Sequence, residues 1–208
     1  MSTSREYKST LRQERARETR LQIRRSARNL FSSQGFGRTT ITQIAKDAGV
    51  SPQTIYAVFG SKGAIVKSMI DDLEESVGMD ALVDRMYAQD DPRTRLRAFV
   101  SIVRKLFEVG APILRAVLAS TETLDVGYIA GRGNENRRKG AGDLVKTLSF
   151  DRALARGLKI EDAADRLWLL CSPEQYFLAV DYLGWTPDRY ERWLGDILDR
   201  ELLEREMS

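Results

Sequence analysis

The chain has 208 residues, of which 42% are hydrophobic and 30% charged, a composition typical of globular proteins with a hydrophobic core. The sequence contains no run of 18 or more apolar residues, and its N-terminus is polar and arginine-rich, so we expect neither a membrane-spanning helix nor a secretory signal. A single cysteine and no histidine exclude an internal disulfide and remove the commonest general base and transition-metal ligand. We therefore expect a cytoplasmic protein that uses no cofactor and no membrane partner.

The net charge of +3 is unevenly distributed along the chain. Residues 1–70 hold 13 Lys and Arg against 4 Asp and Glu, a net charge of +9, whereas residues 71–208 hold 20 basic and 26 acidic residues, a net charge of −6. A basic part beside an acidic remainder is typical of a nucleic-acid-binding protein with a second, separate function. Runs of like charge also occur on ordinary solvated surfaces, so charge alone does not indicate nucleic-acid binding. The pattern of predicted helices in the basic part has to distinguish the two.

The chain begins with a polar, arginine-rich stretch, residues 1–17, that shows little hydrophobic periodicity. We interpret it as a basic flexible arm that follows a groove or the backbone of DNA, and an inert tail fits the same composition. A helix is expected from about Glu18 to Gln34, with its apolar side chains turned inward and its arginines outward, and Gly35 ends it.

Two short helices joined by a tight turn are predicted next. Thr40 begins the first as an N-cap, with Gln43 completing a capping box. Gly49 takes the positive φ of the turn, and Ser51 followed by Pro52 begins the second helix. The spacing is that of a helix-turn-helix, although a helical hairpin in an ordinary core would share it. Each helix has one apolar face, formed by Ile41, Ile44, Ala45 and Ala48 and by Ile55, Val58 and Phe59.

The second of these helices leaves its N-terminal polar side chains on the outside. In a DNA-binding helix-turn-helix such positions meet base edges in the major groove. Gln53 and Thr54 can donate and accept hydrogen bonds there, and the Tyr56 hydroxyl can reach a phosphate oxygen. Lys62 lies in the first turn of the following helix and is expected to bind a phosphate. The candidate DNA-binding residues are Arg38, Thr39, Thr40, Ser51, Pro52, Gln53, Thr54, Tyr56 and Lys62.

Residues 27–65 resemble the N-terminal domain of the TetR family of one-component transcriptional regulators. The resemblance implies an all-α fold with a three-helix, homeodomain-like helix-turn-helix domain over residues 18–65. It further implies a C-terminal helical bundle for ligand binding and dimerisation over residues 66–208, and a homodimer. Gly63-Ala64 departs from the acidic residue that usually follows the lysine, which we expect to change only the stability of the helix start. The shared positions are Ala27, Leu30-Phe31, Gly35-Phe36, Thr39-Thr40-Ile41, Ile44-Ala45, Ala48-Gly49-Val50-Ser51, Thr54-Ile55-Tyr56, Phe59 and Ser61-Lys62.

The remaining chain is expected to be helical. A helix over residues 62–78 starts at the helix-turn-helix and is the expected mechanical link to the C-terminal bundle. Asp91 followed by Pro92 begins a helix that we expect to end near Val109, because Gly110-Ala111-Pro112 should break it. A separate helix is then expected over residues 113–123.

The segment 127–142 contains five glycines, each of which disfavours a helix by about 1 kcal/mol relative to alanine. We expect a helix that begins late there or a partly disordered segment. A phosphate-binding glycine loop is the alternative, but the third glycine and the Gly-Lys-Ser/Thr of such loops are missing. A helix from Leu144 to Leu154, ended by Gly157, is expected to follow.

The last helical regions begin at Ser172-Pro173 and Thr186-Pro187. Their similarity to C-terminal stretches in one branch of the TetR family implies a four-helix bundle across a two-fold axis, while an intramolecular core fits the same residues. The interface candidates are Tyr176, Val180, Tyr190, Trp193, Leu194 and Ile197. The candidates for an apolar ligand pocket, for which plain core is again the alternative, are Phe107, Leu114, Leu118, Trp168 and Phe177.

These features predict a sequence-specific DNA-binding transcriptional regulator. The form that the resemblance favours is a repressor released from a pseudo-palindromic operator by a largely apolar small-molecule effector. A ligand-independent architectural DNA-binding protein is one alternative, although it would not need so large an apolar body. An all-helical enzyme is the other, and the sequence offers it no histidine, metal-ligand cluster or nucleophile motif.

Overall fold

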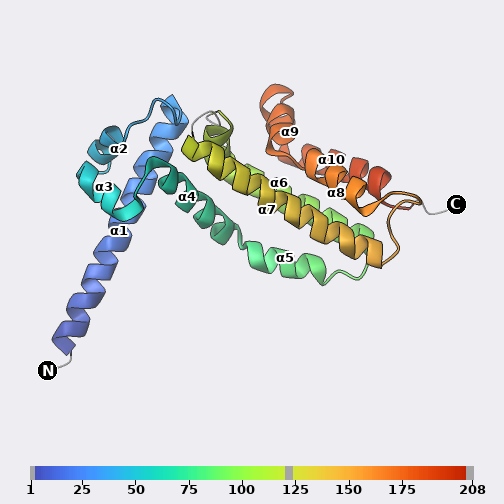
Figure 1. Cartoon of the computed structure of the whole chain (residues 1–208), viewed down its shortest axis with the longest axis horizontal. Helices are drawn as coiled ribbons and strands as arrows, with labels where there is room; N and C mark the ends of the chain where they lie inside the picture. Colours follow the sequence, from blue (N-terminus) through green and yellow to red (C-terminus); the bar gives the residue numbers. More distant parts are fainter. Residues whose placement is uncertain (1–2, 120–123, 205–208) are drawn as a thin grey trace.

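The computed structural model describes residues 3–119 and 124–204, and within these ranges the regular elements are helices (Figure 1). This confirms the all-α prediction. None of the described helices is both long enough and apolar enough to cross a membrane. The elements are α1 (Thr3–Gln34), α2 (Ile41–Asp47), α3 (Pro52–Phe59), α4 (Lys62–Val77), α5 (Met79–Tyr87), α6 (Pro92–Leu118), α7 (Leu124–Phe150), α8 (Ile160–Leu170), α9 (Pro173–Phe177), the π-helical η1 (Leu178–Tyr182) and α10 (Pro187–Leu202).

Local capping chemistry sets the starts of α2 and α3. The Thr40 backbone N–H donates to the Gln43 side chain at 2.8 Å, and the Gln43 backbone N–H donates to the Thr40 hydroxyl at 3.2 Å, which completes the predicted capping box. Gly49 makes the turn with φ of +67°, a conformation that costs glycine little. Ser51 caps α3 by accepting a hydrogen bond from the Thr54 backbone N–H at 3.1 Å.

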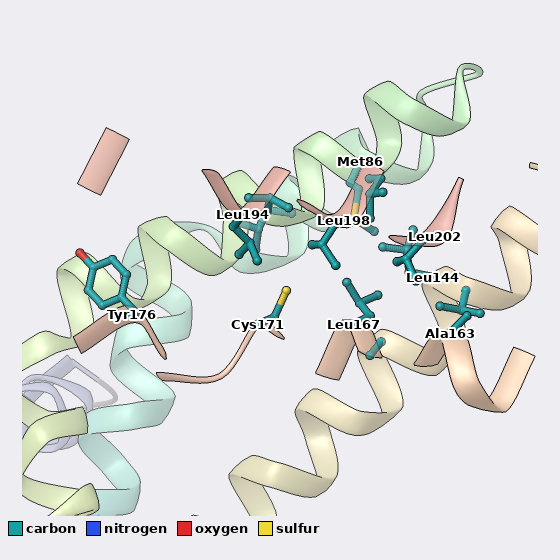
Figure 2. Packing of buried hydrophobic residues seen from close by; sticks show 14 of the residues in the cluster. Met86, Leu144, Ala163, Leu167, Cys171, Tyr176, Leu194, Leu198 and Leu202 are labelled. Atoms are coloured by element: carbon teal, nitrogen blue, oxygen red, sulfur yellow. The ribbon is translucent and has the colours of Figure 1, made fainter. Parts of the chain in front are cut away.

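Two hydrophobic clusters organise the chain. The first joins α1 to α4 and reaches one end of α6, and its fully buried members include Ile23, Ile44, Ile55 and Ile65. The second fills the body between α5 and α10, and Figure 2 shows part of it. In Figure 1, α4 leads from the helix-turn-helix toward α5 and the body. Because α4 contributes Ile65 to the first cluster and contacts α6 and α7, it connects the two parts mechanically.

The structure corrects three predicted helix boundaries. Helix α1 begins at Thr3 rather than near Glu18, so residues 3–17 are helical. Helix α6 continues through Gly110 and Pro112, although proline cannot donate its backbone hydrogen bond. Helix α7 covers the glycine-rich segment 127–142 without interruption and ends at Phe150, before the predicted end at Leu154.

Tertiary packing explains why the glycines and the proline do not end these helices. Helix α7 buries one apolar face, formed by Ala141, Leu144, Val145 and Leu148, in the body core. Helix α6 buries residues along almost its whole length against α4, α5 and α10. Such burial stabilises a helix more than a few unfavourable intrinsic propensities destabilise it. The end predicted for a separate helix at Thr123 lies outside the described residues.

Candidate DNA-binding surface and ligand cavity

Helix α3 presents a polar surface on the side opposite its buried residue. Ile55 is fully buried in the first cluster, whereas Gln53 is exposed and Tyr56 is 55% exposed. Thr54 is partly exposed, and its hydroxyl lies 2.9 Å from that of Ser51. Within the described residues neither Gln53 nor Tyr56 forms a side-chain hydrogen bond, so both remain available to a partner.

The loop between α1 and α2 contains three candidate DNA-binding residues, whose side chains differ in how accessible they are. The Thr39 side chain is buried, where its hydroxyl donates to the Gly35 carbonyl at 2.8 Å, so the prediction that it contacts DNA is wrong for this conformation. Thr40 is exposed, but its hydroxyl is occupied by the capping box. Arg38 is exposed, and its Nε donates to the Gln34 carbonyl at 2.8 Å, which leaves its terminal nitrogens available to a partner without loss of this bond.

Lys62 has a structural position that the sequence did not predict. Its Nζ donates to the carbonyl oxygens of Phe36 at 2.8 Å and Thr39 at 2.7 Å, and it lies 4.0 Å from the centroid of the Phe36 ring. The ammonium therefore fixes the loop that leads into α2 instead of projecting toward a phosphate. In this structure Lys62 therefore positions the loop, whereas the sequence analysis expected it to bind a phosphate.

Arginines of α1 add contacts that sequence reasoning missed. Arg20 donates to the Val58 carbonyl at 3.2 Å, and its guanidinium lies 5.4 Å from the Phe59 ring centroid, which ties α1 to α3. Arg24 forms a 2.5 Å ion pair with Asp72 of α4. The sequence places these arginines on a basic helix but carries no signal for their partners, which lie 38 and 48 residues away. Further toward the N-terminus, exposed basic residues extend the positive surface along α1; they are Arg12, Arg15 and Arg17.

A cavity of about 250 Å³ lies in the body between α5, α6, α7 and α8, with Glu74 of α4 in its wall. Phe107 and Trp168 line it, as the sequence analysis proposed. Leu114, Leu118 and Phe177 do not: the first two pack against the hydrophobic clusters, and Phe177 is buried under the Arg115 guanidinium at 4.6 Å from its ring centroid. Hydrophobic spacing identified these residues as inward-facing, but it could not distinguish a cavity wall from a filled core.

The ionisable groups in the cavity wall are shifted by burial. Desolvation raises the pKa of Glu74, and the neighbouring Asp71 carboxylate raises it further. Burial raises the pKa of the Cys171 thiol to about 12, so this cysteine stays protonated and uncharged at neutral pH. The wall is otherwise dominated by apolar side chains.

The protonated state of Cys171 gives a measurable expectation. The thiolate is the reactive species, so an aromatic disulfide reagent should react at pH 8 at least about 100-fold more slowly with the folded protein than with the urea-unfolded chain. Since Cys171 is the only cysteine, no other thiol contributes to the signal. The rate for the folded protein should keep rising toward pH 12, whereas the unfolded chain should level off above about pH 8.5. Equal rates at pH 8 would contradict the buried, protonated thiol.

The candidate dimer-interface residues fall into two groups, which differ in how deeply they are buried within one chain. Tyr176, Tyr190 and Leu194 are almost completely buried within one chain, so their assignment to a dimer interface is wrong. Tyr176 and Tyr190 pack edge to face with ring centroids 5.0 Å apart. The other three candidates are only partly buried; they are Val180, Trp193 and Ile197.

A set of large apolar side chains is exposed instead on α8, η1 and the turn after η1. It comprises Leu169, Leu178, Tyr182 and Leu183, each more than half exposed. Large apolar side chains that a single chain leaves exposed are candidates for a protein interface. The sequence contains these residues in an apolar stretch, but it does not show which face of that stretch the chain itself covers.

Comparisons with known proteins identify the family. The family model for bacterial regulatory proteins of the tetR family matches residues 23–69. The HTH-type transcriptional regulator TtgR of Pseudomonas putida is 41% identical over 206 residues, which cover 89% of this chain and 92% of TtgR. The HTH-type transcriptional regulator HbdR of Aromatoleum sp. is 44% identical over 64 residues, 29% of this chain and 28% of HbdR.

Solved structures share the fold. NalD, the secondary repressor of the MexAB-OprM multidrug efflux pump in Pseudomonas aeruginosa, has a TM-score of 0.73 at 20% identity and covers 93% of this chain and 100% of its own. The SmeT–triclosan complex has a TM-score of 0.70 at 17% identity and covers 89% of this chain and 92% of its own. Together with the nearly full-length similarity to TtgR, these findings show that the chain is a helix-turn-helix transcriptional regulator and belongs to the TetR family.

Proposed function

We propose that this regulator is a homodimeric repressor that acts in the cytoplasm and leaves its operator when a small molecule binds in the body cavity. Residues 18–65 would form the DNA-binding domain, and residues 66–208 the domain for ligand binding and dimerisation. The observation that carries the proposal is the position of α4, which packs in the helix-turn-helix core at Ile65 and reaches the cavity wall at Glu74. A change in the cavity therefore acts directly on the element that positions α3.

DNA binding would use α3 from each subunit in successive major grooves. A two-fold dimer places such helices about 34–36 Å apart, which requires a pseudo-palindromic operator. Gln53, Thr54 and Tyr56 would make the contacts at the exposed N-terminal part of α3. The basic surface of α1 would add contacts to the phosphate backbone, which carry affinity but no sequence information.

Dimerisation would bury the exposed apolar side chains on α8, η1 and the following turn. Leu169, Leu178 and Tyr182 are 58%, 54% and 81% exposed in the single chain, and water is an unfavourable environment for them. Partly buried Val180 and Trp193 lie in the same C-terminal region and would extend this interface. The dimer would set the distance between the two copies of α3.

Coupling between the cavity and the DNA-binding surface would pass through the contact of α4 with α6. The helices approach closely at Gly110, where an added Cβ would lie 2.4 Å from Leu73 Cδ2. Because the two helices are in close contact here, a shift of α6 would also displace α4. A coupling free energy of about 1–3 kcal/mol suffices to weaken operator binding about 5- to 150-fold.

The named roles of similar proteins support repression and ligand control. NalD is described as a repressor, and SmeT was solved in complex with triclosan. The cavity favours this proposal over a ligand-independent architectural protein. Such a protein would not require an apolar cavity beside the helix that enters the DNA-binding domain.

Duplexes that tile the DNA flanking the protein's own gene test the proposal by mobility shift. We expect one fragment containing an inverted repeat to bind at least about 1,000-fold more tightly than the others, with two subunits per site by analytical ultracentrifugation. Equal binding to all fragments would contradict a sequence-specific regulator. A monomer on the DNA would contradict the dimeric arrangement.

A further inference from the structure

The cavity has an unusual polar group at the end formed by α7 and α8. Arg137 of α7 lies in its wall and is half-buried. Its Nη1 donates to the Asn134 side-chain oxygen at 2.8 Å, and its Nη2 donates to the Trp168 carbonyl at 3.1 Å. Its guanidinium carbon lies 5.4 Å from the centroid of the Trp168 ring. Within the described residues, the hydrogen-bond partners that hold Arg137 against Trp168 are thus neutral.

No carboxylate neutralises Arg137 among the residues that the structure describes. The adjacent Arg138, by contrast, is mostly exposed and forms a 2.9 Å ion pair with Asp165. Burial lowers the pKa of Arg137, while the exposed carboxylate of Glu174 raises it without forming an ion pair. A guanidinium keeps its charge under such conditions, so the cavity wall retains a partly desolvated cation without a counter-ion.

Unlike Arg137, a second hydrogen-bond donor, on the Trp168 side chain that Arg137 contacts, has no acceptor within the described chain. The indole Nε1 of Trp168 is buried and has no hydrogen-bond partner in the described parts of the chain. A buried donor left unsatisfied costs about 1–3 kcal/mol, so the hydrogen-bonding groups at this end of the cavity are not fully satisfied by the described chain itself. The protonated Cys171 thiol in the same wall is only a weak acceptor.

The rest of the wall defines the remainder of the ligand. Phe99, Val103 and Phe107 present apolar surface from α6. The acidic group of the wall, Glu74, lies on α4, and the charges that shift its pKa are Asp71, Lys67 and Asp80 rather than Arg137. The cavity therefore combines an apolar body with one cationic, donor-rich end.

We propose that the cavity binds a compact, largely aromatic or aliphatic molecule that carries one anionic oxygen group, a carboxylate or a phenolate, held by Arg137 beside the Trp168 ring. The planar fork of a guanidinium matches the two oxygens of a carboxylate, and such charge-assisted hydrogen bonds are stronger than neutral ones. The inference rests on the proposed function, because it specifies the chemical class of the effector. It also predicts that cationic molecules of the same shape are rejected.

Calorimetry on the full chain without DNA tests the inference with matched probes. The probes are 2-naphthoate, its neutral amide 2-naphthamide, and the cation 2-naphthylmethylammonium. We expect naphthoate to bind at least tenfold more tightly than the amide, because only the carboxylate brings a negative charge and two acceptor oxygens to the Arg137 guanidinium. The cation should bind more weakly than the amide.

Two arginine variants on one helix separate a specific contact from a change in net charge. Arg137→Gln should weaken naphthoate binding about 10- to 100-fold and leave naphthamide binding unchanged, which also shows that the variant is folded. Arg138→Gln removes the same charge from an exposed position and should leave both affinities at the wild-type level.

Equal affinities of the wild type for naphthoate and naphthamide would overturn the inference, as would an unchanged preference in Arg137→Gln or no binding of either probe at millimolar concentration. These outcomes are independent of the proposed function, which the mobility-shift experiment measures without ligand. If naphthoate binds as expected but does not release the operator, the ligand class stands and ligand-controlled repression fails. If an operator is bound but the acid has no advantage, the ligand class alone fails.

Discussion

Replacing Gln53 and Tyr56 together by alanine should lower the affinity for the operator at least about 100-fold and bring it close to that for unrelated DNA. Both side chains are exposed on α3, and each contact to a base edge or phosphate in the major groove contributes about 1–3 kcal/mol. The free energy of unfolding should change by less than about 0.5 kcal/mol, because neither side chain packs in the core. Fluorescence anisotropy and urea unfolding measure the two quantities.

A glutamine far from the DNA-binding surface provides the control. Gln175 is exposed on α9, so Gln175→Ala should leave operator affinity and stability at wild-type values. If the Gln53, Tyr56 double variant binds the operator as tightly as the control, α3 does not read the DNA. If the double variant loses affinity and also unfolds at lower urea concentration, the loss reports folding rather than recognition.

Replacing Lys62 by methionine should lower both stability and operator affinity. Methionine keeps an apolar stem near Phe36 but removes the ammonium, which leaves the carbonyl oxygens of Phe36 and Thr39 without this donor. We expect the free energy of unfolding to fall by about 1–3 kcal/mol. Operator affinity should fall about tenfold, because the loop before α2 loses a contact that orients the helix-turn-helix.

The dependence of operator binding on salt distinguishes this role from a phosphate contact. A lysine that binds a phosphate contributes about 0.9 to the slope of log affinity against log salt. If Lys62 positions the loop, Lys62→Met keeps the wild-type slope; a slope lowered by about one, with unchanged stability, would contradict that role. Lys67→Met is the matched control on the same helix, since Lys67 is exposed and, among the described residues, pairs with Asp71 at the surface.

The sequence predicted those features that depend on neighbouring residues. The capping box of Thr40, the turn at Gly49 and the caps at Ser51 and Asp91 all follow from local chemistry, and the structure contains each of them. The resemblance to the TetR family implied the all-α fold class, and the caps and the 3.6-residue periodicity of apolar positions agreed with it. These signals need no knowledge of distant contacts.

Predictions from the sequence were wrong or incomplete where contacts between residues far apart in the chain determine the structure. Pro112 and the glycines of α7 were expected to interrupt helices, but burial against other helices outweighs their local preference. The Lys62 ammonium donates hydrogen bonds to carbonyl oxygens 23 and 26 residues away, and residue spacing within a helix cannot reveal such partners. The sequence left open whether Tyr176 and Tyr190 belong to a dimer interface or to an intramolecular core, and only the packed chain shows that their partners belong to the same subunit.

The most direct test of the central claim, that α3 reads the operator, is a double-mutant cycle between Gln53 and the base pairs of one half-site. Anisotropy is measured for wild type and Gln53→Ala on the natural operator and on operators with single base-pair substitutions. We expect one substitution that costs the wild type about 1–3 kcal/mol and costs Gln53→Ala almost nothing further, because both changes remove the same contact. If every substitution weakens the two proteins equally, Gln53 contacts no base, and recognition through the N-terminal part of α3 is contradicted.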